Sequence, residues 1–426
     1  MEAHEKLDQF FRELLQKMRR ADPSTYDIFL QGAEAAFNSL GYREKLFPSV
    51  ENILIVRLDV IGDMILTSGF IREVRKNFPR ARITLVCSPF VHPIVELCPY
   101  VNEILTFDKK NLNEISPQMM KAIINFCKKN FWQKHFSIAF APQWGSDNLP
   151  GLMMCWLSGA RERIGFGSFP YESWIGKPNP KETALDNFLL TKNIITPRSA
   201  VSEVEKIFYL LTAAGLKVNQ THTEIWFGEA DTFQAWKLLE NIPSTSKKVL
   251  LGIGAGFPSR KYPVKKFLVA LKELVKKNLT FVIVGGKSEF ADAKFIEENL
   301  PSGKVLNLVG QTTLRETEAV VSQMDFYLGN ATGVMHMAAA AQVSVLTIYR
   351  GSADKEDDFL PGAFSECRRF PPWQTKSVIL RPDRQLEECA KRGPIYGWCH
   401  VSDRPHCIAQ ISPQKIIDGF EKLEAL

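Results

Sequence analysis

The stretch from Ile53 to Thr67 constrains the fold of this chain more than any other part of its sequence. It begins with four apolar residues, Ile53 to Val56, which predict a strand buried on both faces, as in a parallel sheet. A polar turn follows, and apolar residues then recur at helical spacing: Met64, Ile65, Leu66, Phe70, Ile71 and Val74. Because strand, turn and helix in this order open a βαβ unit, the stretch predicts an α/β fold.

Two residues in this turn are candidates for a functional site, because ligands of open α/β sheets bind at the carboxyl ends of the strands. Gly62 allows the backbone to approach a ligand closely. Asp63 lies at the predicted helix start, where the helix dipole stabilises a negative charge. The local pattern leaves two roles open for Asp63, a chemical one and that of a carboxylate that only stabilises the helix start.

The bulk properties of the chain exclude several classes of protein. Its 426 residues are enough for two or three domains, and 45% hydrophobic and 23% charged residues are ordinary for a globular protein. A net charge of +6 suits an anionic substrate or an anionic membrane surface but is too small to indicate binding to nucleic acid. No apolar stretch of about 20 residues predicts a transmembrane helix, and the first residues lack the features of a signal peptide.

The chain has eight cysteines. In a long chain without a signal sequence they indicate reduced thiols or metal ligands of a cytoplasmic protein and not a disulfide framework. Four thiolates suit a tetrahedral structural site for zinc or iron. Four of the cysteines cluster near the C-terminus: Cys367, Cys389, Cys399 and Cys407. Their spacing lacks a CxxC pair, so reduced thiols in a loop remain the alternative.

Strands and helices alternate twice along the chain, in residues 47–240 and again in residues 241–410. The second series begins with a polar, proline-containing linker at 241–248. Regular alternation predicts a parallel sheet with helices on both faces in each half. We therefore expect two doubly wound domains that face a ligand-binding cleft.

Three parts of the chain depart from this alternation. Residues 1–46 predict two helices, which we interpret as an extension packed on the main body and not as a membrane-surface helix, because acidic residues are mixed into the polar face. Residues 351–410 are expected to be irregular, with a cysteine-rich region at 360–410. Residues 411–426 predict an amphipathic helix that ends the chain.

The second domain repeats the opening pattern of the first. Residues 249–253 predict a strand, and a glycine-rich turn after it carries Arg260 and Lys261. Gly254 and Gly256 allow close backbone approach, and two adjacent cations suit a diphosphate. The alternative is a solvated basic pair ahead of a helix.

Two more polar turns follow strands in this domain. Glu289 comes after the strand at 280–284, and a carboxylate there can accept hydrogen bonds from ribose hydroxyls. The glycine spacing fits neither a Walker loop nor GxGxxG, which excludes a P-loop NTPase and a standard NAD site. In the stretch 329–336, the helix start at Thr332 and Gly333 is a predicted anion site, because its backbone N–H groups are unpaired.

Six short motifs occur in a fixed order between residues 50 and 350. They are Arg57-x-x-x-x-Gly62-Asp63 with Thr67, Arg163-Ile-Gly-Phe166, Gly254-Ala-Gly with Arg260-Lys-Tyr-Pro263, Gly286-x-x-Glu289, Leu308-Val-Gly310 and Thr332-Gly-x-x-His336-x-Ala-Ala339. Each is weak alone, but as an ordered set they resemble the ADP-heptose:lipopolysaccharide heptosyltransferase family. The resemblance implies an inverting glycosyltransferase with two Rossmann-like domains, the GT-B architecture.

The resemblance also implies a role for each matching residue. Asp63 matches the general base that takes a proton from the acceptor hydroxyl. Arg260 stands where the family usually has a lysine, and it would bind the donor phosphates together with Lys261. Glu289 matches the residue that contacts the adenosine ribose. Three residues match the donor-binding turn: Thr332, Gly333 and His336.

The chain departs from the family pattern at two places. The family usually has an aspartate directly before the Thr-Gly pair, where this chain has Ala331, and that aspartate contacts the donor sugar. Asn330 is the residue expected to take over part of this contact. In the first domain the family often has Asp-Leu-Gln where this chain has Ala141-Pro-Gln143, so the acceptor contacts are expected to differ.

The implied reaction transfers a heptose from ADP-heptose to a hydroxyl of a glycan, lipopolysaccharide or protein acceptor, in the bacterial cytoplasm. An inverting displacement needs one carboxylate on the acceptor side and positive charge on the leaving diphosphate. It requires no metal if Arg260, Lys261 and the helix start at Thr332 neutralise the phosphates. A branch of the family that glycosylates autotransporter proteins carries a four-cysteine iron site, which the region 360–410 resembles in outline.

Two other functions remain as alternatives. A non-catalytic nucleotide-sugar-binding protein on the same fold is retained because of Ala331. A sugar-nucleotide epimerase of GT-B type would release its product without an acceptor. The sequence leaves open a peripheral contact with the inner membrane and the formation of a homo-oligomer.

Overall fold

The described residues fall into two compact units. The computed structural model describes residues 52–109, 117–144, 148–167, 189–197, 199–350, 366–384 and 407–426. The units lie within residues 1–60, 70–92 and 98–221 for the first, and 61–69, 93–97 and 222–426 for the second. The predicted helical extension at 1–46 lies outside the described residues, as do Cys389 and Cys399 of the predicted metal site.

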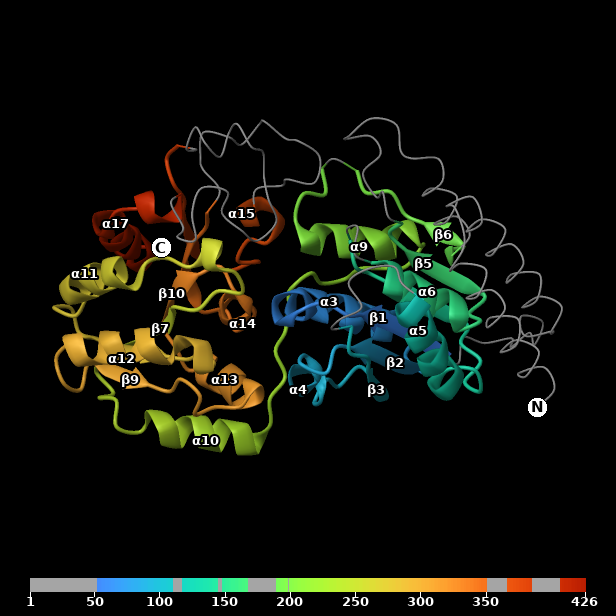
Figure 1. Cartoon of the computed structure of the whole chain (residues 1–426), viewed down its shortest axis with the longest axis horizontal. Coiled ribbons are helices and arrows are strands. Elements are labelled where there is room, and N and C mark those ends of the chain that lie inside the picture. The colour runs from blue at the N-terminus through green and yellow to red at the C-terminus, as the bar shows by residue number, and fades with distance from the viewer. Residues whose placement is uncertain are drawn as a thin grey trace. The chain divides into compact units, whose positions relative to one another are not determined.

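The first unit is built on a six-stranded sheet in the order β3-β2-β1-β4-β5-β6 (Figure 1). Every neighbouring pair of strands is parallel. The strands are β1 (Asn52–Arg57), β2 (Arg82–Cys87), β3 (Glu103–Thr106), β4 (Ile138–Ala141), β5 (Glu162–Gly165) and β6 (Lys192–Asn193). This is the strand order of dinucleotide-binding folds, which bind ligands at the carboxyl edge where the order reverses, here between β1 and β4.

The helices of this part of the chain are α3 (Ile61–Asn77), α4 (His92–Val95), α5 (Pro117–Asn130), α6 (Leu149–Leu157) and α9 (Glu203–Ala213). The side chain of Ser202 accepts a hydrogen bond from the Glu205 amide at 3.1 Å and fixes the start of α9. The predicted two-sided burial of β1 is confirmed, because Ile53 to Val56 are at most 1% exposed. One face of β1 packs against buried side chains of α5 and α6, including Ile123, Leu152 and Trp156.

The second unit contains another six-stranded parallel sheet, in the order β12-β11-β10-β7-β8-β9. The strands are β7 (Lys247–Gly252), β8 (Leu279–Ile283), β9 (Val305–Asn307), β10 (Phe326–Asn330), β11 (Ser344–Ile348) and β12 (Ser377–Leu380). Numbered from β7, this sheet repeats the order of the first, and its order reverses between β7 and β10. The predicted α/β class with two doubly wound sheets is confirmed.

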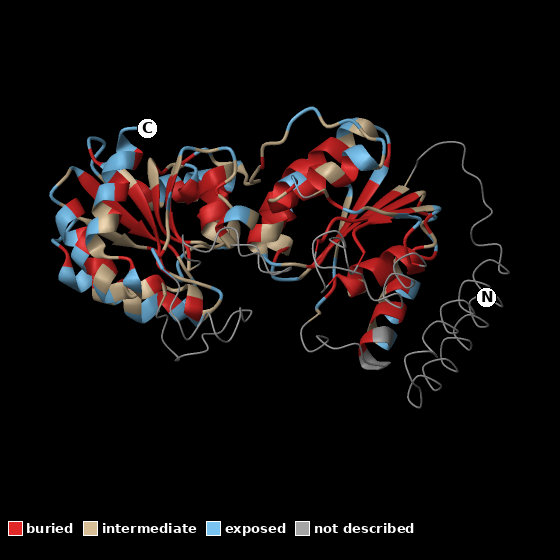
Figure 2. Ribbon diagram, turned by 90° about the horizontal axis from the view of Figure 1, so that it is seen from above, coloured by how far each residue is buried: buried red, intermediate tan, exposed pale blue. Residues whose placement is uncertain are grey.

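Helices cover both faces of this sheet, as the buried strands in Figure 2 indicate. The α-helices are α10 (Glu229–Leu239), α11 (Val264–Leu274), α12 (Phe290–Asn299), α13 (Leu314–Val321), α14 (Gly333–Ala340), α15 (Glu366–Arg369) and α17 (Pro413–Glu424). Short 3-10 helices lie at η1 (Pro258–Arg260), η2 (Lys287–Glu289) and η4 (Ile408–Gln410). The predicted C-terminal helix is confirmed as α17, whose buried Ile416 and Phe420 belong to the core of the second sheet.

The expectation that residues 351–410 are irregular is wrong for part of that region. Strand β12 pairs in parallel with β11, and α15 begins at Glu366. The sequence failed to indicate β12 because four residues are too short to establish a period of two. Helix α10 also escaped prediction, because two of its apolar residues, Phe233 and Trp236, point outward and are 65% and 57% exposed.

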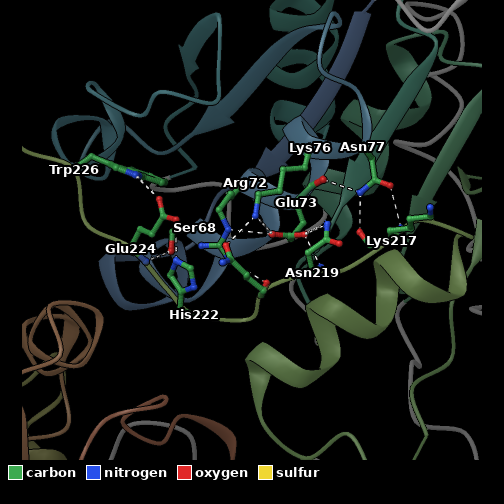
Figure 3. Close-up of polar contacts among 11 residues, drawn as sticks. Ser68, Arg72, Glu73, Lys76, Asn77, Lys217, Asn219, His222, Glu224 and Trp226 are labelled. Carbon is green, nitrogen blue, oxygen red and sulfur yellow. Dashed lines mark hydrogen bonds and ion pairs between the residues drawn. The ribbon is translucent and has the colours of Figure 1, made fainter.

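Buried polar contacts fix the segment that follows α9 (Figure 3). In the first unit, Glu73 is fully buried and accepts hydrogen bonds from the Asn219 amide at 2.8 Å and from Arg72 and Lys76 at 3.1 Å. Burial alone would raise the pKa of Glu73, but these hydrogen bonds lower it below its usual value. In the second unit, the Ser68 hydroxyl accepts a hydrogen bond from the Glu224 amide at 2.7 Å.

Candidate functional site

The end of β1 is fixed by Arg57, the first residue of the motif around Asp63. Its guanidinium is 1% exposed and donates hydrogen bonds to the Pro142 carbonyl at 2.9 Å and to Glu203 at 3.1 Å. It also lies 2.8 Å from a carboxylate oxygen of Asp59. Arg57 therefore joins the ends of β1 and β4 to the start of α9, and it acts as a structural residue of the carboxyl edge.

Asp63 lies in the first turn of α3, as the sequence predicted. Its side chain is half-buried, and the α3 dipole favours its ionised form. Thr67, which belongs to the same motif, donates its hydroxyl hydrogen to the Asp63 carbonyl oxygen at 2.7 Å. Thr67 therefore supports the helix turn that carries the carboxylate.

Within the second unit, the start of α3 packs directly against the start of α14. A Cβ atom added at Gly62 would lie 2.9 Å from Cδ2 of His336. A Cβ atom added at Gly333 would lie 2.9 Å from Cγ2 of Ile61. Real Cβ atoms do not approach other atoms so closely, so both positions require glycine. This packing places the turn that carries Asp63 beside the predicted anion-binding turn.

The start of α14 has the features of an anion site. Thr332 is the N-cap residue and makes no side-chain cap, so the first N–H groups of the helix are left for a ligand. His336 is 6% exposed, and its Nδ1 atom has no hydrogen-bond partner among the described residues. Burial lowers the pKa of His336 to about 4. The imidazole is therefore neutral at pH 7 and carries no positive charge.

Asn330 is the last residue of β10, whereas the sequence placed it in the turn. It is fully buried, and its Oδ1 atom accepts a hydrogen bond from the Tyr262 amide at 3.0 Å. Its Nδ2 atom donates to the carbonyl oxygens of Ile253 and Gly254 at 3.0 and 3.1 Å. The amide thus holds the turn after β7 against the end of β10. The predicted contact of Asn330 with the donor sugar stays a prediction.

Glu289 lies at the end of β8, in η2, and is 9% exposed. Its carboxylate accepts hydrogen bonds from the Gly286 amide at 2.9 Å and from the Ser288 hydroxyl at 2.7 Å. Cβ atoms added at Gly254 or Gly285 would lie 2.9 and 3.2 Å from Glu289 atoms. The glycines therefore make space for this carboxylate at the carboxyl ends of the adjacent strands β7 and β8.

The two predicted phosphate-binding cations each have a carboxylate partner. Arg260, at the end of η1, lies 2.8 Å from Glu366 of α15. Lys261 lies 2.7 Å from Asp292 of α12. Their side chains are 25% and 30% exposed, so a ligand can still reach both cations. A third cation, Arg350, was missed by the sequence analysis, although a basic residue close behind the end of a strand is the signal that indicated Arg260 and Lys261.

The predicted metal site is described only in part. Cys367 is buried in α15, and Cys407 is half-buried next to η4. No group of three metal-binding side chains occurs in the part of the chain that the structure describes. In the same residues, no helix is long and apolar enough to cross a membrane.

Comparison with known proteins finds a matching family model and similar proteins. The family model described as glycosyltransferase family 9 (heptosyltransferase) matches residues 181–398, slightly more than half of the chain. Lipopolysaccharide heptosyltransferase 2 of Salmonella typhimurium is 20% identical over 393 residues, which are 87% of this chain and 98% of that protein.

Two solved structures have the same fold. A glycosyl transferase family 9 protein from Veillonella parvula superposes with a TM-score of 0.67 and 17% identity, over 88% of this chain and 97% of that one. The E. coli heptosyltransferase WaaC, solved with ADP-2-deoxy-2-fluoro heptose, gives a TM-score of 0.59 and 14% identity, over 87% of this chain and 99% of that one. Both likenesses extend over nearly the whole of the solved chains.

Proposed function

The chain belongs to glycosyltransferase family 9 (heptosyltransferase), and from this premise we propose that it transfers a heptose from ADP-heptose to a hydroxyl of a glycan, lipopolysaccharide or protein acceptor. The single observation that carries this proposal is the packing of Gly62 against His336. It brings the turn with the carboxylate of Asp63 next to the anion site at the start of α14. An inverting displacement needs these two groups on the two sides of one anomeric carbon.

On the acceptor side, the proposed base is Asp63. Its carboxylate takes the proton of the acceptor hydroxyl while the hydroxyl oxygen forms a bond to the anomeric carbon. The bond between that carbon and the diphosphate oxygen breaks at the same time, and its electron pair leaves with ADP. No carboxylate nucleophile is needed, because no covalent glycosyl intermediate forms in a single inverting displacement. No general acid is needed either, because a diphosphate leaves as an anion without being protonated.

On the donor side, the diphosphate gains negative charge as it leaves. The N–H groups at Thr332 and Gly333 and the cations Arg260 and Lys261 would stabilise this charge. An arginine has five N–H donors, so Arg260 can contact a phosphate and keep its carboxylate partner. His336 is neutral at pH 7 and would supply a hydrogen bond. These groups support the prediction that transfer needs no metal.

Glu289 would bind the adenosine ribose. Each of its carboxylate oxygens accepts one hydrogen bond from the protein, from Gly286 and from Ser288. A carboxylate has about four acceptor sites, so two remain for ribose hydroxyls. The position at the end of β8, next to β7, is where such carboxylates lie in dinucleotide folds.

Several further features stay proposals. A structural iron or zinc ion held by Cys367, Cys389, Cys399 and Cys407 is tested by metal analysis of the purified protein. A homo-oligomer is tested by light scattering, and peripheral attachment to the inner membrane by cell fractionation. None of these enters the proposed transfer step.

Transfer assays test the proposed function directly. Purified protein is incubated with ADP-heptose and, separately, with lipopolysaccharide core, glycan and protein acceptors, and both ADP release and heptosylated product are measured. Product formation with one acceptor class supports the proposal and identifies the acceptor. Failure to bind ADP-heptose would contradict it. A non-catalytic binder and an epimerase are not favoured, because the family consists of transferases.

A further inference from the structure

Two guanidinium groups converge on one carboxylate oxygen in the second unit. Arg260 donates to Oε1 of Glu366 from Nε at 3.1 Å and from Nη2 at 2.8 Å. Arg350 donates to the same oxygen from Nη2 at 2.6 Å. Its Nη1 atom also donates to the Ser259 hydroxyl oxygen at 3.0 Å. Arg350 is thereby held directly beside Arg260.

Among the residues that the structure describes, the charge of this cluster is not balanced. Two guanidinium groups and one carboxylate leave an excess of one positive charge. The three side chains of Arg260, Arg350 and Glu366 are 25%, 20% and 18% exposed, so the cluster is desolvated in part but open to a ligand. Partly exposed ion pairs of this kind contribute only about 1 kcal/mol or less to stability, which makes a purely stabilising role a weak explanation for two adjacent cations.

The position of Arg350 fits a ligand of the proposed donor site. Arg350 comes two residues after the end of β11, and β11 pairs with β10, whose carboxyl end leads into the turn at Thr332. Its other neighbour, Ser259, lies in η1 next to Arg260. Arg350 therefore lies at the same carboxyl edge of the sheet as the anion site of α14.

We propose that Arg350 is a second cation for the leaving diphosphate, and that Glu366 is a positioning residue that holds Arg260 and Arg350 side by side. This inference rests on the proposed function. A diphosphate presents several charged oxygens, and paired guanidinium groups match them with parallel N–H donors better than one cation does. The proposal adds a residue that the sequence motifs did not contain.

Titration of the full chain with ADP, AMP and adenosine tests the role of Arg350. R350Q is expected to weaken ADP binding about tenfold or more, as for the loss of a hydrogen bond to a charged group, and to leave adenosine binding unchanged. R350K should bind ADP more tightly than R350Q but more weakly than the native chain, because lysine restores the positive charge without the planar set of N–H donors of a guanidinium group. K277Q is the matched control, because Lys277 is also ion-paired, to Glu424 at 2.6 Å, but precedes β8 at its amino end.

Three outcomes distinguish this inference from the proposed function. If R350Q binds ADP like the native chain while R260Q does not, the inference is overturned and the proposed function stands. If the native chain does not bind ADP, both are overturned. If the thermal unfolding curve shows that R350Q does not fold, R350K is compared with the native chain instead. An affinity of R350K for ADP equal to that of the native chain then overturns the inference.

E366Q tests the positioning role. The amide no longer attracts both cations, so the two guanidinium groups separate, and ADP binding is expected to weaken while adenosine binding stays the same. If Glu366 merely competed with the diphosphate, E366Q would raise the affinity for ADP because the net positive charge increases. Tighter ADP binding by E366Q would therefore overturn the positioning role of Glu366.

Discussion

The Oδ1 atom of Asn330 accepts a hydrogen bond from the backbone amide of Tyr262 at 3.0 Å, across 68 residues of sequence. The same side chain donates to the carbonyls of Ile253 and Gly254. One buried amide thus fixes the turn after β7 against the end of β10, where the order of the second sheet reverses. The turn in question leads into η1 and Arg260, so this hydrogen-bonding network links the core to the proposed phosphate site.

The first prediction concerns Asn330 itself. N330A leaves three backbone groups without their partner, two of them buried at Tyr262 and Ile253 and one partly buried at Gly254, so we expect a loss of about 1–3 kcal/mol in the free energy of unfolding. Urea denaturation of the purified variant measures this loss. Q311A is the control, because Gln311 is exposed and its side chain donates a hydrogen bond to the Asn307 carbonyl. Equal stability of N330A and Q311A would contradict the structural role.

The second prediction concerns the proposed base. D63N removes the proton acceptor but keeps the shape of the side chain, so kcat should fall by roughly 100-fold or more. ADP binding should be unchanged, because the carboxylate acts on the acceptor. Initial rates and calorimetric titration with ADP measure the two quantities. Retention of the native kcat would refute the assignment of Asp63 as base.

The third prediction uses the contact between two helix starts. In G62A the new Cβ would lie 2.9 Å from the His336 ring, and overpacking of this kind costs about 1–3 kcal/mol. We expect lower transfer activity and weaker ADP binding, because the ring must move from its place at the start of α14. G151A is the matched control, since Gly151 lies on α6 outside the proposed site and its new Cβ would make only an ordinary contact, 3.7 Å from Val56 Cγ1. Similar activity of both variants would show that the contact does not matter for function.

The sequence predicted the local parts of this arrangement and missed the long-range ones. The strand at Ile53 to Val56 and the helix start at Asp63 are encoded within a few consecutive residues, so pattern alone placed them. The ion pair between Arg260 and Glu366 joins residues 106 positions apart, and no local pattern contains that information. Helix α10 was missed for another reason. Its exposed Trp236 interrupts the helical spacing of apolar residues that marks a buried face.

The fourth prediction tests ribose recognition by Glu289. E289Q keeps the size of the side chain but replaces one acceptor oxygen by an amide donor, so it should bind ADP more weakly than the native chain does. The same substitution should have little effect on binding of 2′,3′-dideoxy-ADP, which lacks the hydroxyls. Competition titrations with the two nucleotides measure this difference. An equal loss of affinity for both nucleotides would indicate a structural defect instead of a lost ribose contact.

The last prediction concerns the pH dependence of stability through Glu318. This residue of α13 is 1% exposed, and burial raises its pKa to about 9, although a hydrogen bond from the Trp226 backbone lowers it in part. The folded chain therefore keeps the Glu318 proton up to about pH 9, while the unfolded chain releases it near its ordinary pKa of 4.5. The stability contributed by the proton is full below pH 4.5 and is lost as the pH rises toward 9.

E318Q carries a permanently neutral side chain of the same size, so it should remove this contribution to the pH dependence. We expect the free energy of unfolding of E318Q to fall less than that of the native chain between pH 5 and 9, about the window set by the two pKa values. Urea denaturation at several pH values measures both curves. E316Q serves as control, because Glu316 lies on the same helix but is only half-buried, and its carboxylate accepts a hydrogen bond from the Thr313 amide. Parallel curves for E318Q and the native chain would mean that Glu318 is ionised in the folded protein at neutral pH.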